Sequence, residues 1–226
     1  MLEPSRFWVE RIVRPVYKAK QTEQTLTTTI FQAPSKPVIL PGCIAGESLL
    51  SQIIVDKFLY HLPEYRQAKR FKELEVEIPT SSINRWVHVL ADKLYGLYAA
   101  QMERVLSGNY IQVDETTHPI TDRPGSARKG YIWAVRSVLF PGVFFYYNKG
   151  SRSQEVVLKM LKGYQGALQT DGYAAYSIYE EKEGVLPLGC MAHVRRKFEQ
   201  ALTTMPEAKP ALDYIALLYM LEGNLK

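Results

Sequence analysis

The spacing of apolar residues changes once along this chain, near residues 107–109. Before that point, from residue 46 to about residue 106, apolar side chains recur with the 3.6-residue period of an α-helix. After Asn109 they alternate with polar side chains in short runs, and Gly- and Pro-rich stretches separate the runs, as in β-strands. The chain is therefore expected to fold as a helical region followed by a region built on a β-sheet.

Three segments are expected from this change. Residues 1–41 form an N-terminal arm and linker, with a β-prone stretch at 25–31 and three prolines that space the chain before the helices begin. Residues 42–108 form the helical region, and residues 109–226 form the sheet region. An apolar fraction of 46% is enough for a hydrophobic core.

A helix-turn-helix pattern lies within the helical region. One helix is expected over residues 64–74, and a second begins near Thr80 after a short link. Asn84 and Arg85 fall in the first two turns of the second helix, where a DNA-reading helix contacts bases. The alternative is an ordinary helical hairpin in which Arg85 is a solvated charge, and the sequence leaves both open.

After residue 109 the expected order is three strands joined by short links, then helix, strand, helix, strand and helix. This order predicts a mixed α/β fold, in which a mixed sheet is covered by flanking helices. The expected ranges are strands 110–117, 130–138, 143–147, 167–170 and 185–188, helices 153–161 and 192–202, and a helical or looped piece up to residue 179.

Two aspartates lie at the ends of expected strands. Asp114 lies in YIQVDETT, and Asp171 directly follows the fourth strand. If the first and fourth strands are adjacent, both carboxylates can reach one place, where they would suit Mg²⁺ or Mn²⁺ and a bridged phosphate. Each aspartate taken alone could equally be a strand-end or turn residue facing water, and Asp171 before Gly172 is typical of a turn.

A basic segment, GCMAHVRRKF, follows the last expected strand. His193, Arg195, Arg196 and Lys197 lie near the start of its helix, and the spacing puts His193, Arg196 and Lys197 on one face. These side chains are candidates for contacting a phosphate backbone. The alternative is a solvated basic face.

Composition narrows the possible binding partners and the possible cellular compartment. A formal charge of +5 and a pI near 9.0 are compatible with a polyanionic partner such as nucleic acid. Cys43 and Cys190 are too few for a disulfide framework or a four-cysteine zinc site, which fits a reducing cytoplasm. Neither a signal peptide nor an apolar run of membrane-spanning length is present, so a cytoplasmic protein without membrane contact is expected.

Several stretches together resemble the insertion sequence 66 family of bacterial transposases. They are LPGCIAGESLLSQIIVDKFLYHLPEYRQAKRF (40–71), SSINRWV (81–87), IQVDET (111–116), TDGYAAY (170–176) and CMAHVRRKFEQA (190–201), in the order of the family. The resemblance implies an RNase H-like catalytic fold and an Asp-Asp-Glu triad. Asp114 matches the first catalytic aspartate and Asp171 the second, while Cys190 and His193 match a Cys-x-x-His signature.

The resemblance implies DNA strand cleavage and transfer that depend on Mg²⁺ or Mn²⁺. The expected partners are the ends of an insertion sequence, target DNA and further copies of the chain in a homo-oligomer. The chain departs from the family pattern in two places. The arm at 16–26 lacks the cysteines of a zinc-binding module, and no motif resembling that of the catalytic glutamate follows the basic helix.

These departures predict a truncated, inactive copy in which Glu222 is a solvated residue at a helix end. Two alternatives remain. One is a DNA-binding protein without catalysis, which would act as a repressor or competitor of an intact transposase. The other is a nuclease of the same fold that cleaves without strand transfer. A requirement for a divalent metal separates the enzymes from the binding protein, and the reaction products separate the two enzymes.

Overall fold

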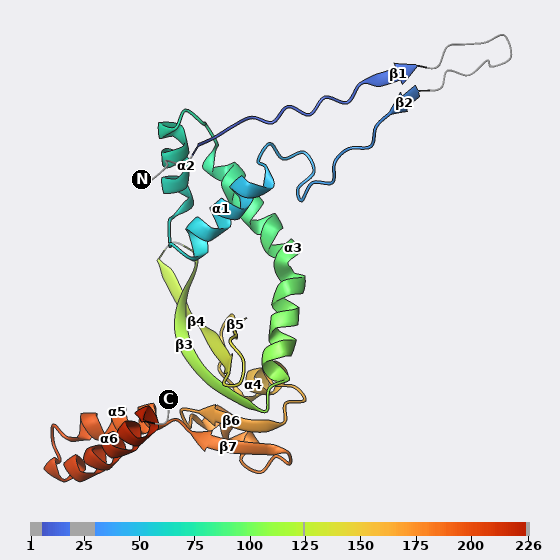
Figure 1. Ribbon diagram of the computed structural model, residues 1–226. Helices are drawn as coiled ribbons and strands as arrows, with labels where there is room; N and C mark the ends of the chain where they lie inside the picture. Colours follow the sequence, from blue (N-terminus) through green and yellow to red (C-terminus); the bar gives the residue numbers. More distant parts are fainter. Residues whose placement is uncertain (1–5, 19–29, 124, 225–226) are drawn as a thin grey trace. The chain divides into compact units, whose positions relative to one another are not determined.

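The computed structural model describes residues 6–18, 30–123 and 125–224 (Figure 1). The chain divides into two compact units, Met1–Leu94 and Tyr95–Lys226, so the division falls within the long helix α3 (Thr80–Leu106). The boundary predicted from the sequence lies later, after residue 108. In the described part of the chain, no helix has both the length and the apolar character needed to cross a membrane.

The first unit begins with a two-stranded antiparallel ribbon. It pairs β1 (Val16–Lys18) with β2 (Ile30–Gln32). Only the last two residues of the β-prone stretch predicted at 25–31 are in β2, and residues 25–29 lie outside the described residues.

Three helical segments form the core of the first unit. They are α1 (Glu47–Phe58), α2 (Glu64–Glu73) and the first half of α3. Ile53 and Ile83 lie at positions of the predicted helical period and are fully buried, whereas Phe58 at the end of α1 is 59% exposed. The buried apolar residues of this core are Leu40, Ala45, Leu50, Ile53, Phe71, Ile78, Ile83, Trp86, Val87 and Leu90.

Polar contacts join α1 to α2. The buried Gln67 amide donates hydrogen bonds to the carbonyls of Ile53 (3.3 Å) and Leu62 (3.0 Å). Lys57 donates to Glu64 at 2.7 Å. Burial raises the pKa of Glu64, but hydrogen bonds from Lys57 and Asn84 and the charge of Lys57 outweigh it, so the pKa lies below its ordinary value.

The second unit is built on a sheet with the order β5-β4-β3-β6-β7 among the described residues. The strands are β3 (Tyr110–Arg123), β4 (Ser126–Ser137), β5 (Val143–Asn148), β6 (Gly166–Thr170) and β7 (Val185–Gly189). The first three pair antiparallel, whereas β3, β6 and β7 run parallel, with Pro187 of β7 opposite Leu168 of β6. The predicted mixed α/β fold is confirmed.

The β3–β4 hairpin is longer than predicted, because its strands continue into the polar segment that was expected to be a loop. Pairing extends past Thr117 opposite Tyr131 to Ile120 opposite Arg128, where the register becomes irregular. Gly130 allows this close packing, since a Cβ there would lie 2.6 Å from a terminal carbon of Ile120.

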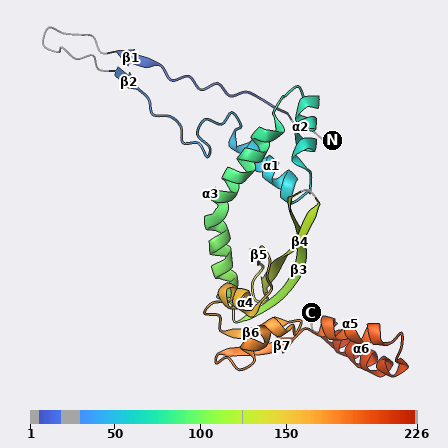
Figure 2. The same ribbon diagram turned by 180° about the vertical axis from the view of Figure 1, so that it is seen from behind.

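Helical segments cover the sheet and extend beyond it. In the views of Figures 1 and 2, α4 (Gln154–Met160) lies beside the strands, and α5 (Met191–Ala201) lies next to α6 (Lys209–Gly223) after β7. Two short 3-10 helices, η1 (Ala174–Tyr179) and η2 (Pro206–Ala208), complete the unit. The core residues are Val105, Ile111, Val113, Trp133, Val135, Phe144, Val156, Val157, Met160, Leu161, Tyr164, Leu168, Ala175, Tyr176 and Tyr179.

Candidate metal centre

The register between β3 and β6 brings the two predicted aspartates together. Gln112 pairs with Gln169 across these parallel strands, and their side-chain amides hydrogen-bond at 2.7 Å. Asp114 and Asp171 lie two residues further along their segments, so they reach the same level of the sheet on the face that carries the glutamines. The predicted adjacency of the two strands is confirmed, while a catalytic role for the aspartates stays a prediction.

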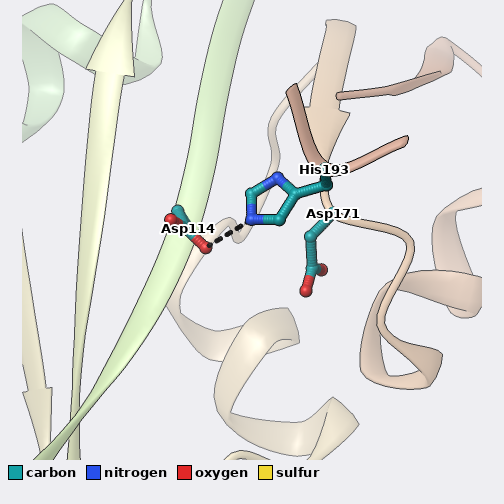
Figure 3. A group of neighbouring side chains, drawn as sticks. All are labelled: Asp114, Asp171 and His193. Atoms are coloured by element: carbon teal, nitrogen blue, oxygen red, sulfur yellow. Dashed lines mark ion pairs between the residues drawn. The ribbon is translucent and has the colours of Figure 1, made fainter. Parts of the chain in front are cut away.

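His193 joins the aspartates from the start of α5. The N–H of Cys190, the residue before α5, donates to the carbonyl of Thr170 at 2.8 Å, which ties the start of α5 to the end of β6. One ligand atom each from Asp114, Asp171 and His193 lies within 4.8 Å of the others, and the three side chains converge in Figure 3. His193 Nε2 is 4.0 Å from Asp114 Oδ1.

Backbone amides orient both carboxylates. The N–H of Glu115 donates to Asp114 Oδ1 at 3.0 Å, and the N–H of Tyr173 donates to Asp171 Oδ1 at 2.9 Å. The second contact bends the chain through Gly172, whose φ of +79° is in the left-handed region that suits glycine. Asp171 therefore forms the turn that was predicted for it and also faces Asp114.

Glu115 lies behind this site, on the opposite face of β3. Its side chain is only 5% exposed, it accepts a hydrogen bond from the Tyr176 hydroxyl at 2.7 Å, and its Oε1 lies 3.9 Å from Arg152 Nη1. Burial raises the pKa of Glu115; the Tyr176 hydrogen bond opposes this, while the nearby aspartates add to it. Burial and the charge of Glu115 likewise raise the pKa of Tyr176.

The donor set fits a divalent cation. The three ligand atoms lie within 4.8 Å of one another, which is close to the span of about 4.2 Å between two ligands that are each about 2.1 Å from one ion. A spread of this size also suits two ions about 3.5 to 4 Å apart. Carboxylate oxygens suit Mg²⁺ and Mn²⁺, and imidazole favours Mn²⁺ between these two.

The sequence did not predict that His193 and Glu115 would lie at this candidate site. His193 was predicted to contact DNA. The Cys-x-x-His spacing at a helix start was the signal that could have suggested a metal ligand instead. Its position beside Asp114 depends on β7 lying next to β6, which determines where α5 begins. Glu115 had a simpler signal, since strand alternation places it on the apolar face with Val113.

The other predicted DNA-contacting residues lie on exposed helix surfaces. The Asn84 amide donates to Glu64 Oε2 at 3.0 Å, so in this structure it makes a contact within the first unit, and Arg85 is exposed. On α5, Arg195 pairs with Glu199 at 2.6 Å, while Arg196 and Lys197 are exposed. Their predicted binding to DNA stays a prediction.

Glu222 lies in the last turn of α6 and is exposed, as expected. Among the described residues, the group of potential metal ligands consists of Asp114, Asp171 and His193 and does not include Glu222.

Comparison with known proteins identifies the family. Residues 42–226 match the IS66 family of transposases, which is most of the chain. The chain belongs to this transposase family. The resemblance found in the sequence motifs is thereby confirmed.

Relatives of similar sequence occur in Sinorhizobium fredii (strain NBRC 101917 / NGR234). The chain is 30% identical to protein y4jD over 99% of its own length and 46% of that protein, and 31% identical to protein y4qI over 86% of its own length and 38% of that protein. The chain thus spans about half the length, or less, of these relatives. No solved structure matches the chain.

Proposed function

We propose that this chain carries the metal-binding part of a DNA transposase that cleaves and transfers DNA strands with Mg²⁺ or Mn²⁺. The observation that carries the proposal is the convergence of the Asp114 and Asp171 carboxylates at one level of adjacent parallel strands. Membership of the transposase family supplies the reaction class and DNA as the partner.

Each residue of the site has a role in this proposal. Asp114 and Asp171 hold the cation, and His193 supplies a third ligand atom. A bound Mg²⁺ or Mn²⁺ would supply an activated water and stabilise charge on the phosphate. The amides of Glu115 and Tyr173 keep the carboxylates oriented before DNA arrives.

The strand order supports assignment of the second unit to the RNase H-like fold. Three antiparallel strands are followed by two parallel ones, and the aspartates lie on the first and after the fourth strand in chain order. This placement agrees with the role that the family resemblance implies for each aspartate.

DNA contacts are proposed at two surfaces, each on its own unit. On α5, Arg196 and Lys197 are exposed in the turn after His193, which suits phosphate backbone contacts near the metal ligands. On the first unit, α2 and α3 form the helical pair that presents Asn84 and Arg85.

A second candidate function, DNA binding without catalysis, is favoured by one observation. The ligand group among the described residues contains two carboxylates and an imidazole, not the three carboxylates that the family resemblance implies. A repressor or competitor of transposition needs DNA affinity but no metal.

The two functions are separated by metal binding and by DNA cleavage. Mn²⁺ should bind the purified chain, and Asp114→Asn and Asp171→Asn should each abolish that binding without unfolding the protein. DNA carrying the ends of the element should be nicked only with metal and with both aspartates present. A wild-type chain that binds DNA but neither binds Mn²⁺ nor nicks would establish the second function instead.

A further inference from the structure

The two amides that hold the metal-site carboxylates belong to residues whose side chains share a partner. Glu115 holds Asp114, and Tyr173 holds Asp171. The guanidinium carbon of Arg152 lies 4.1 Å from the centre of the Tyr173 ring, and Arg152 Nη1 lies 3.9 Å from Glu115 Oε1. Arg152 thus touches both residues that orient the ligands.

Arg152 comes from a part of the chain that carries neither aspartate. It directly precedes Ser153, the residue before α4, whereas Glu115 is on β3 and Tyr173 follows β6. A single side chain therefore links three separate segments on the side of β3 opposite the metal ligands. Tyr176 adds a second link, because its hydroxyl joins η1 to Glu115 at 2.7 Å.

Because Glu115 is buried, these contacts restrict the position of its side chain. A carboxylate that is 5% exposed requires partners, and Tyr176 and Arg152 supply a hydrogen bond and a positive charge. Both partners restrict where the Glu115 side chain can lie, and so restrict its backbone amide. Stacking on Arg152 restricts Tyr173 in the same way.

We propose that Arg152 is a positioning residue that sets the separation of the Asp114 and Asp171 carboxylates through Glu115 and Tyr173. The Tyr176 hydroxyl supports the same arrangement through its hydrogen bond to Glu115. This inference rests on the proposed function, because it assigns Arg152 to the support of that metal site. Partners behind metal ligands commonly change metal affinity by about 10- to 100-fold when they are removed.

A merely structural role for Arg152 makes a different prediction. Its side chain is 45% exposed and contributes little to the core, so Arg152→Ala should fold. A structural role would lower the unfolding temperature without changing the affinity of the folded protein for metal. A positioning role lowers metal affinity while the unfolding temperature stays close to that of the wild type.

The test is titration of the purified chain with Mn²⁺, followed by the loss of the electron paramagnetic resonance signal of free Mn²⁺. Arg152→Ala should weaken binding about 10-fold. Arg152→Lys keeps the charge but loses the planar stacking group, so its affinity should lie between those of Arg152→Ala and the wild type. The matched control is Lys182→Ala, which removes a cation 4.6 Å from the centre of the Tyr179 ring and should leave Mn²⁺ affinity unchanged.

A second pair of variants tests the same inference without altering a charge. Tyr176→Phe removes the hydroxyl bonded to Glu115 and should also weaken Mn²⁺ binding. Tyr179→Phe is its control, since that buried hydroxyl donates to the Leu161 carbonyl at 3.4 Å. If Arg152→Ala proves much less stable than Lys182→Ala, this tyrosine pair decides the question.

Wild-type affinity in both Arg152→Ala and Tyr176→Phe would overturn the inference, and loss of binding in Asp114→Asn would show that the proposed metal site itself stands. Failure of the wild-type chain to bind Mn²⁺, or unchanged binding in Asp114→Asn, would overturn the inference and the proposed metal site together.

Discussion

At the scale of single residues, the candidate site combines exposed potential ligands with a buried side chain behind them. Asp114 is exposed, while its neighbour Glu115 is buried, because successive residues of a strand point to opposite faces. The face of β3 that carries Asp114 is therefore open to solvent, while the Glu115 side chain behind it is held by Tyr176 and Arg152. His193 is half-buried between these extremes, with its Nε2 directed at Asp114 (Figure 3).

His193→Ala should weaken Mn²⁺ binding by about 10-fold or more and Mg²⁺ binding less, since imidazole is a better ligand for Mn²⁺ than for Mg²⁺. Calorimetric titrations with each metal would measure the difference. His118→Ala is the control, because His118 is on the same strand as Asp114 but packs against the Tyr147 ring. Equal losses for both metals would argue against direct ligation by His193.

The sequence predicted some of these residues because their positions depend on local patterns. Asp171 directly follows β6 as predicted, whereas Asp114 lies within β3 and not at its end, because β3 continues to Arg123. The order of elements was nevertheless enough to suggest that the first and fourth strands are neighbours. The approach of His193 depends on the register of β7 against β6 and on the start of α5, which no local pattern encodes. The contact between Arg152 and Tyr173 likewise requires the position of α4.

At the scale of elements, the polar composition of the start of β4 made that part of the sheet difficult to predict. The start of β4 contains Arg128 and Lys129, whose charges are typical of a loop, yet both residues pair with β3. The helices were easier to predict, because the apolar period of α1 and α3 extends over several turns and Pro63 marks the break before α2. Short polar strands lack such a signal.

Acid should destabilise the junction of α1 and α2 through Glu64. The pKa of Glu64 is lowered by folding, so its contribution to stability is present above its unfolded pKa of about 4.5 and is lost as the pH falls through the folded value. Thermal unfolding of the wild type and Glu64→Gln between pH 7 and pH 3 would measure this. The variant should be less stable at pH 7, and the two should converge in acid; a constant difference would contradict the assignment.

The exposed basic side chains of α5 should contact the phosphate backbone of DNA. Arg196→Ala with Lys197→Ala should weaken binding to all sequences and reduce the salt dependence by about 0.9 per lost phosphate contact. Arg195→Ala should have a smaller effect, because Glu199 already pairs with Arg195. Measuring binding across a series of salt concentrations gives the slope for each protein. If the slopes of these variants equal that of the wild type, α5 is an ordinary solvated helix.

At the scale of the whole molecule, the candidate metal site joins segments far apart in the chain. The ligands come from β3, from the residue after β6 and from α5, so they meet only when the parallel part of the sheet has formed. An unfolded chain offers no such group, so metal binding at these residues would stabilise the folded second unit.

Mn²⁺ at about 100 times its dissociation constant should raise the free energy of unfolding of the second unit by about 2.7 kcal/mol. Calorimetry would detect this as an upward shift of its unfolding transition. The transition of the first unit should stay unchanged, because the ligand group lies within the second unit. Asp171→Asn should abolish the shift, and a shift that persists in this variant would place the binding site elsewhere.

Pro187 has a consequence for self-association of the sheet. The N–H of Cys190 points toward β6, and donors alternate along a strand, so position 187 faces away from β6. Proline has no N–H, which leaves the outer margin of β7 without one of the donors that an incoming strand would need. Edge-to-edge polymerisation through β7 is thereby opposed by a covalent feature of the backbone that persists whether or not DNA or metal is bound.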